Sequence, residues 1–203
     1  MFDHVFLIDY QDCPPNEKLH SFLQKETSQD IIEFGIPDLP AQYQLKIEIL
    51  TYKRFQQGIH ETNLSASVRQ HCIAYSDNAV HCIDYSFLAD SMPIENYLMI
   101  IRHECIHILQ HLATRIPPQL ASWLYESVAC ARAGQKMPRP AKVPPWHGFV
   151  TDFSSIPERY ALAYEFGTCL LKHVSLGELV KRCKDFVSFK DECEKIYNDT
   201  FSQ

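Results

Sequence analysis

The feature that most constrains this chain is the segment IIRHECIHILQHLA, residues 100–113, which carries two histidines four positions apart. Residues four apart on an α-helix share one face and lie about 6 Å apart along the axis. His103 and His107 can therefore bind one metal ion together, because zinc accepts imidazole nitrogens at about 2.0–2.1 Å. Glu104 is displaced by one position, from where it can take a proton from a water on the metal. The segment predicts a helix with part of a zinc site.

A catalytic zinc site needs a third protein ligand and one open position. His111 is too far along a straight helix to share a tetrahedral ion with His103, and no glycine turn follows to fold the chain back. Glu126 is the better candidate, because it lies on a second predicted helix that begins after a two-proline break. The sequence therefore predicts His103, His107 and Glu126 as the ligands of one zinc ion per chain.

Hydrophobic periodicity separates a strand-rich first half of the chain from a helical second half. The first half predicts one helix over 14–29 and strands over 4–9, 43–53 and 71–86, the last folded into a hairpin at Asp77 and Asn78. The second half predicts helices over 91–115, 118–134 and 156–175, one or two more over 176–197, and a proline-rich loop over 135–155. We expect an α+β fold in one domain, 1–203, with a β-rich lobe over 1–90 and a helical lobe over 91–203.

Composition excludes several other classes of protein. The net charge is −6 and no arginine-rich arm is present, which argues against nucleic acid as a partner. No apolar run is long enough for a signal peptide or a membrane span, so we expect a cytoplasmic protein with no membrane partner. The 8 cysteines form no CxxC pair, which favours reduced thiols over a disulfide framework or a zinc ribbon.

The segment HECIH, followed after eighteen residues by Glu126 within WLYESVA, resembles the gluzincin metallopeptidases. The M1-type aminopeptidases and the leukotriene hydrolases share this spacing, and the small peptidase-MA-like families have a shorter form of the scheme. The resemblance covers roughly residues 43–182 and implies a zincin-like (thermolysin-like) catalytic domain that hydrolyses peptide bonds with zinc. It implies that His103, His107 and Glu126 hold the metal, and that Glu104 is the general base and then the proton donor to the leaving amine.

The resemblance also implies a tyrosine, on the helix after the third ligand, that stabilises the oxyanion. Tyr160 and Tyr164 lie four apart on one face of that predicted helix. Alignment with the small peptidase-MA-like families favours Tyr160, whereas alignment of YEFG with the aminopeptidase YEKG favours Tyr164. Both remain candidates, with Tyr160 preferred.

Two further segments are expected near a bound peptide. The strand around 79–85 resembles the edge strand of the family and would pair with an extended peptide or protein substrate. The loop over 137–149, with Trp146 and His147, is interpreted either as a border of the cleft or as a stiff surface connection. The sequence leaves the substrate and the oligomeric state open.

The chain departs from the family pattern at three positions. YSDNAVHC lacks the glutamate with which the aminopeptidases grip the amine of the substrate, although Asp77 could replace it. Cys130 stands where some gluzincins have an acid, and Ser127 replaces the usual glycine.

The alternatives to a peptidase are a non-catalytic zinc- or peptide-binding protein with a zincin fold, and a metal-free helical domain whose three ligands do not converge. Retention of Glu104 argues against the binding protein, because a structural zinc site needs no base.

Overall fold

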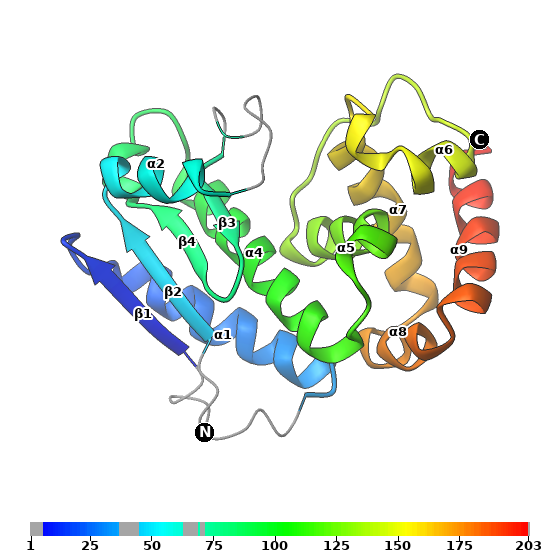
Figure 1. Cartoon of the computed structure of the whole chain (residues 1–203), viewed down its shortest axis with the longest axis horizontal. Coiled ribbons are helices and arrows are strands. Elements are labelled where there is room, and N and C mark those ends of the chain that lie inside the picture. Colours follow the sequence, from blue (N-terminus) through cyan, green and yellow to red (C-terminus); the bar gives the residue numbers. More distant parts are fainter. Residues whose placement is uncertain (1–5, 37–44, 63–68, 70–71, 203) are drawn as a thin grey trace. The chain divides into compact units, whose positions relative to one another are not determined.

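The computed structural model describes residues 6–36, 45–62, 69 and 72–202 of the 203-residue chain. These residues form an α+β fold with a small four-stranded mixed sheet and many helices (Figure 1), so the expected α+β class is confirmed. The chain divides into two compact units. The first comprises residues 1–30 and 37–108, and the second comprises residues 31–36 and 109–203.

The sheet of the first unit has the strand order β1-β2-β4-β3. Three strands run parallel, namely β1 (Phe6–Gln11), β2 (Leu45–Leu50) and β4 (Val80–Ile83), and β3 (Ala74–Ser76) is antiparallel to β4. In β2, the buried side chains of Ile47 and Ile49 alternate with the half-buried Glu48, as expected for a strand with one apolar face. The three predicted strand regions are confirmed in their central parts, but the second ends at Leu50, because a helix begins at Tyr52, and the third ends at Ile83. Residues 4, 5, 43, 44 and 71 lie outside the described residues.

The strand β4 is not at the edge of the sheet. It pairs with β2 along one side and with β3 along the other, so both sides of its backbone are used. The expectation that a strand around 79–85 offers a free edge to a peptide is therefore wrong. The alternating pattern predicts the β3–β4 hairpin, but the second partner of β4 comes from a parallel contact that is distant in sequence.

The helices of the first unit begin with α1 (Glu17–Glu33), where the Asn16 side chain accepts a hydrogen bond from the Leu19 N–H at 3.0 Å. The helix predicted over 14–29 is confirmed, with a later start and a later end. Helix α2 (Tyr52–His60), which buries Phe55 and Ile59 and directly follows β2, was not predicted from the sequence. The unit continues through a short 3-10 turn, η1 (Tyr85–Phe87), into α4 (Ile94–Thr114), the predicted helix that carries the two histidines.

Helix α4 is anchored within the first unit on both sides. The guanidinium of Arg102 donates to both carboxylate oxygens of the fully buried Asp30, each at 2.9 Å, and lies 2.7 Å from a carboxylate oxygen of Glu26 on the same helix α1. The hydroxyl of Tyr97 donates to the carbonyl of Ile83 at 2.8 Å, which connects α4 to β4. The residue directly before His103 is therefore held by a buried ion pair.

The second unit contains the remaining helical elements. They are α5 (Pro118–Ala133), α6 (Trp146–Thr151), η2 (Phe153–Ser155), α7 (Arg159–His173), α8 (Leu176–Arg182), η3 (Cys183–Asp185) and α9 (Phe186–Phe201). The helices predicted over 118–134, 156–175 and 176–197 are confirmed. Gly134 ends α5 in the left-handed conformation, with a φ of 74°, as its sequence position predicts.

Aromatic side chains fill the core of the second unit. The ring centroids of Trp123 and Trp146 lie 5.0 Å apart, and those of Phe149 and Tyr197 lie 4.8 Å apart. The prediction of a loop over 135–155 is wrong in its second half, because α6 forms there and packs its apolar side chains into this core. Trp146 is buried except for a small part of its surface, whereas His147 is exposed, and both residues line a shallow pocket of the second unit.

Helices α5 and α7 approach each other at Gly167. A Cβ atom at this position would lie 1.9 Å from the carbonyl oxygen of Ser127, far inside van der Waals contact. The absence of a side chain on Gly167 therefore allows the two helix backbones to touch, and this contact fixes α5 within its unit.

Candidate metal centre

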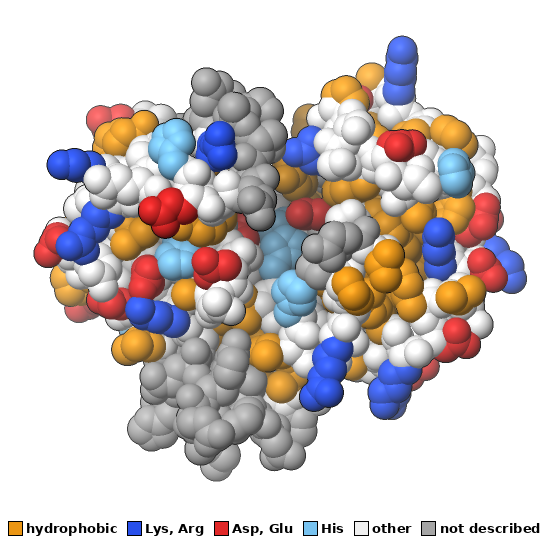
Figure 2. Space-filling view, viewed as in Figure 1, with side chains coloured by type: hydrophobic (Ala, Val, Ile, Leu, Met, Phe, Trp, Pro, Cys, Tyr) orange, Lys and Arg blue, Asp and Glu red, His pale blue; other side chains and the backbone are white. Residues whose placement is uncertain are grey.

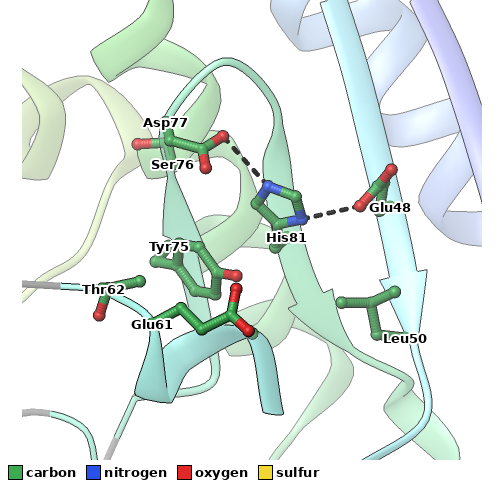
Figure 3. A pocket seen from close by; sticks show the side chains of 9 residues that line it. Glu48, Leu50, Glu61, Thr62, Tyr75, Ser76, Asp77 and His81 are labelled. Carbon is green, nitrogen blue, oxygen red and sulfur yellow. Dashed lines mark hydrogen bonds and ion pairs between the residues drawn. The ribbon is translucent and has the colours of Figure 1, made fainter. Parts of the chain in front are cut away.

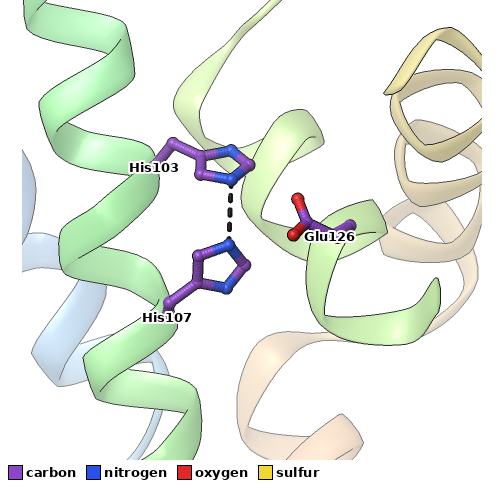
Figure 4. A group of neighbouring side chains, drawn as sticks. All are labelled: His103, His107 and Glu126. Atoms are coloured by element: carbon purple, nitrogen blue, oxygen red, sulfur yellow. Dashed lines mark hydrogen bonds between the residues drawn. The ribbon is translucent and has the colours of Figure 1, made fainter. Parts of the chain in front are cut away.

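The side chains of His103, His107 and Glu126 come together in the structure (Figure 4). One ligand atom from each residue lies within 4.8 Å of the others, and His103 is buried while the other two are half-buried. Four-coordinate zinc with bonds of 2.0–2.1 Å would hold its ligand atoms about 3.3–3.4 Å apart. The three side chains are therefore a group that could hold one metal ion.

The two imidazoles are placed by the repeat of α4. Their Nε2 atoms lie 2.9 Å apart, and the rings meet edge to face with centroids 4.5 Å apart. This arrangement directs a nitrogen of each ring to one point, as the spacing of four residues predicts. His111, one turn further on, is exposed and lies edge to face with the ring of Tyr125, outside the group of three.

The position of Glu126 depends on contacts of α5 inside the second unit. Gln110, near the end of α4, donates to the carbonyl of Tyr125 at 3.0 Å, and the hydroxyl of Tyr125 donates to the carbonyl of Ile116 at 2.9 Å. These bonds hold the residue directly before Glu126. Ser127, directly after it, supplies the carbonyl that meets Gly167. Glu126 is therefore fixed on both sides by packing that no local sequence pattern specifies.

The candidate general base Glu104 has a hydrogen-bond partner that the sequence did not predict. The hydroxyl of Ser76, at the end of β3, donates to Oε2 of Glu104 at 2.7 Å. The only clue in the sequence was the position of Ser76 just before the predicted turn at Asp77. That clue indicates a strand end but does not indicate which helix the side chain meets.

The two candidate tyrosines differ in their surroundings. Burial, and secondly the negative charge of Glu126, raise the pKa of Tyr160 to about 12. Tyr160 is nevertheless 37% exposed, and the guanidinium of Arg159 lies 4.8 Å from the centre of its ring. Its hydroxyl is therefore protonated at neutral pH. Tyr164 is half-buried on the same helix.

A second polar cluster lies in a pocket of the first unit and contains no member of the group of three (Figure 3). The nitrogens of His81 lie 2.8 Å from a carboxylate oxygen of Glu48 and 3.1 Å from one of Asp77. Tyr75 stacks on the same imidazole with centroids 4.8 Å apart. The carboxylates of Glu48 and Asp77 therefore both interact with the imidazole of His81. Asp77, the suggested substitute for the amine-binding glutamate, belongs to this cluster.

Charged side chains of both signs are mixed on the face of the molecule that Figure 2 shows. In Figure 2, Lys and Arg are scattered among Asp and Glu over the coloured residues, without a single basic patch. Among the helices that the structure describes, none has both the length and the apolar character to cross a bilayer.

Comparisons with protein-family models, curated proteins and solved structures found no match to this chain. Two imidazoles and one carboxylate are a donor set that could hold a metal ion, and a carboxylate lies directly beside the first imidazole in the sequence.

Proposed function

We propose that this protein is a zinc-dependent peptidase of the gluzincin type with a zincin-like fold. The observation that supports this most strongly is the group of three side chains with ligand atoms within 4.8 Å of one another. They are the same residues, His103, His107 and Glu126, that the HExxH motif and its distant glutamate predict. A metal-free helical domain would have no reason to bring them together.

The donor set suits zinc better than magnesium or calcium, which prefer oxygen ligands. When bound, zinc lowers the pKa of water towards about 7 and polarises a carbonyl group. His103, His107 and Glu126 would hold the ion. The hydrogen bond between Gln110 and the Tyr125 carbonyl would keep Glu126 in position when the metal binds.

Glu104 performs the proton transfers in the proposed reaction. Its carboxylate accepts a proton from the attacking water while the water oxygen forms a bond to the peptide carbon. The same proton then passes to the peptide nitrogen as the carbon–nitrogen bond breaks. The products are a free carboxylate and a free amine, so no other reactant is needed.

Tyr160 is the proposed donor to the oxyanion. A phenol with its pKa raised to about 12 remains protonated at neutral pH and can donate a hydrogen bond to a developing negative charge. The charge of Glu126 contributes to this raised pKa, which favours Tyr160 over Tyr164 as the donor.

The experiment compares wild-type protein with Glu104→Gln, a substitution that preserves the shape of the side chain and removes its basicity. Zinc content is measured by mass spectrometry, and cleavage is followed on casein and on a peptide library. We expect both proteins to bind zinc, and cleavage to fall by at least about 100-fold in the variant, as is typical for general acid–base catalysis.

Two results would contradict the proposal. Zinc-independent cleavage that survives Glu104→Gln would assign the activity to another site or a contaminant. Zinc binding without cleavage of any substrate would favour the binding-protein alternative.

A further inference from the structure

We propose that Ser76 is a positioning residue that holds the carboxylate of Glu104 in one orientation. The proposal rests on the function proposed above, because it gives Glu104 the role of general base. It is carried by the 2.7 Å hydrogen bond from the Ser76 hydroxyl to Oε2 of Glu104. Both residues belong to the first unit, and they are 28 positions apart in sequence.

The backbone of Ser76 is fixed by the β3–β4 hairpin. Ser76 pairs with Val80, which is fully buried, and the turn between them is closed by two hydrogen bonds between Asp77 and Ala79. The Asp77 carboxylate also contacts His81 on β4 at 3.1 Å (Figure 3). Ser76 therefore projects from a tightly constrained strand end rather than from a loose loop.

Strand alternation directs the Ser76 side chain towards α4. Cys82 on β4 contacts the hydroxyl of Tyr97 on α4, so the face of the sheet that carries Cys82 is the α4 face. Val80 lies two residues from Cys82 on the same face, and Ser76 stands directly opposite Val80 in the antiparallel pair. The Ser76 hydroxyl therefore reaches Glu104 while the backbone of Ser76 keeps regular strand geometry.

Cys72 does not replace Ser76 as the donor to Glu104. Its thiol donates to the carbonyl of Ala74 at 2.8 Å. Burial, and then the charge of Glu104, raise the pKa of Cys72 to about 11, so the thiol stays protonated at neutral pH. The Ser76 hydroxyl is thus the group that restrains the carboxylate from the side of β3.

The two carboxylate oxygens of Glu104 therefore have different roles. Oε2 accepts a hydrogen bond from the Ser76 hydroxyl, which leaves Oε1 to accept the proton of the attacking water. A carboxylate that rotates freely would present this second oxygen correctly for only part of the time. Ser76 therefore acts through Glu104 and does not itself touch the reacting atoms.

The test compares Ser76→Ala with Ser76→Thr, which keeps the hydroxyl and suits a strand. Ser91→Ala is the matched control, because its hydroxyl donates only to a nearby carbonyl, that of Leu88, at 3.1 Å. We expect Ser76→Ala to lower kcat about tenfold, the effect of one hydrogen bond to a charged group, with KM and zinc content unchanged. Ser76→Thr and Ser91→Ala should keep kcat within about twofold of wild type.

A second readout needs no activity. Crystal structures of metal-free wild type and Ser76→Ala should show one Glu104 conformer in the wild type and several in the variant. An unchanged kcat, an equal loss in Ser76→Thr, or a single Glu104 conformer in Ser76→Ala would each overturn the proposal. If the wild type neither binds zinc nor cleaves peptides, the proposed function fails. If the wild type is active and Ser76→Ala has the same kcat, only the role of Ser76 is rejected.

Discussion

His103 and His107 are placed by the geometry of one helix, whereas Glu126 is placed by the packing of another. The helical repeat of α4 alone brings the two Nε2 atoms to 2.9 Å. Glu126 depends on the hydrogen bond from Gln110 to the Tyr125 carbonyl and on the backbone contact at Gly167. Two of the three candidate ligands are therefore determined locally, and the third is determined by tertiary structure.

This difference indicates which substitutions should weaken the candidate metal centre without replacing one of its ligands. Substitutions in the core of the second unit should displace Glu126 and leave the imidazole pair intact. Substitutions that loosen α4 from α1 should reduce the stability of the first unit but keep the spacing of the pair, because that spacing is a property of the helix itself.

The largest effect is expected from removing one imidazole. His103→Ala or His107→Ala deletes one ligand of three, and we expect zinc affinity to fall more than about 100-fold, beyond the 10–100-fold that follows loss of a residue that only orients a ligand. Competition with a chelating dye measures the affinity. His111→Ala, on the same helix, is the control and should bind zinc as the wild type does; an equal loss there would contradict the assignment of ligands.

Breaking the buried ion pair of α4 should have the next largest effect. Arg102→Met leaves the fully buried Asp30 without its bidentate partner, and we expect about 3–5 kcal/mol less stability in urea denaturation. Lys18→Met is the control, since the Lys18–Glu95 pair is 58% and 61% exposed and should contribute less than about 1 kcal/mol. Similar losses in the two variants would show that Arg102 does not anchor α4.

A methyl group at Gly167 should separate α5 from α7. Gly167→Ala places an atom 1.9 Å from the Ser127 carbonyl oxygen, and we expect about 3 kcal/mol lower stability together with weaker zinc binding. Gly148→Ala is the control, because its nearest contact would be 3.7 Å, an ordinary van der Waals distance. Denaturation curves and zinc titrations measure both quantities. A Gly167→Ala protein as stable as the wild type would disprove the close approach.

The smallest effect is expected from the bond that precedes Glu126. Gln110→Met keeps the side-chain volume but removes the donor to the Tyr125 carbonyl, which should cost about 1 kcal/mol of stability. Zinc affinity should fall a few-fold, far less than in the histidine variants. Thermal denaturation and the same dye competition measure these changes, and a loss of affinity as large as that of His107→Ala would mean that Gln110 itself binds the metal.

The parts of the structure that sequence predicts well are those with a strong local period. The helix of the HExxH motif, the helix that begins after the two prolines and the hairpin at Asp77 all follow from patterns within a short window. The convergence of Glu126 with the histidines was predicted from a family spacing rather than from a period. The contacts at Gln110 and Gly167 that position α5 have no counterpart in a local sequence pattern.

The errors have physical causes in contacts that are distant along the chain. Helix α2 was missed because its nine residues contain a polar run and only two buried apolar positions, Phe55 and Ile59. Strand β4 was taken for an edge because its pairing with β2 is parallel and non-local. The burial of Trp146 in the aromatic core was not predicted, because its partners, Trp123 and Phe166, belong to other helices.

The most direct test of the account is the zinc content of wild-type protein and of Glu126→Ala, each reconstituted with zinc and dialysed. We expect about one zinc per wild-type chain and a large loss of zinc in the variant, with circular dichroism showing that the variant remains folded. A wild type that binds no zinc, or a Glu126→Ala protein that keeps its zinc with unchanged affinity, would contradict the claim that His103, His107 and Glu126 form one metal centre.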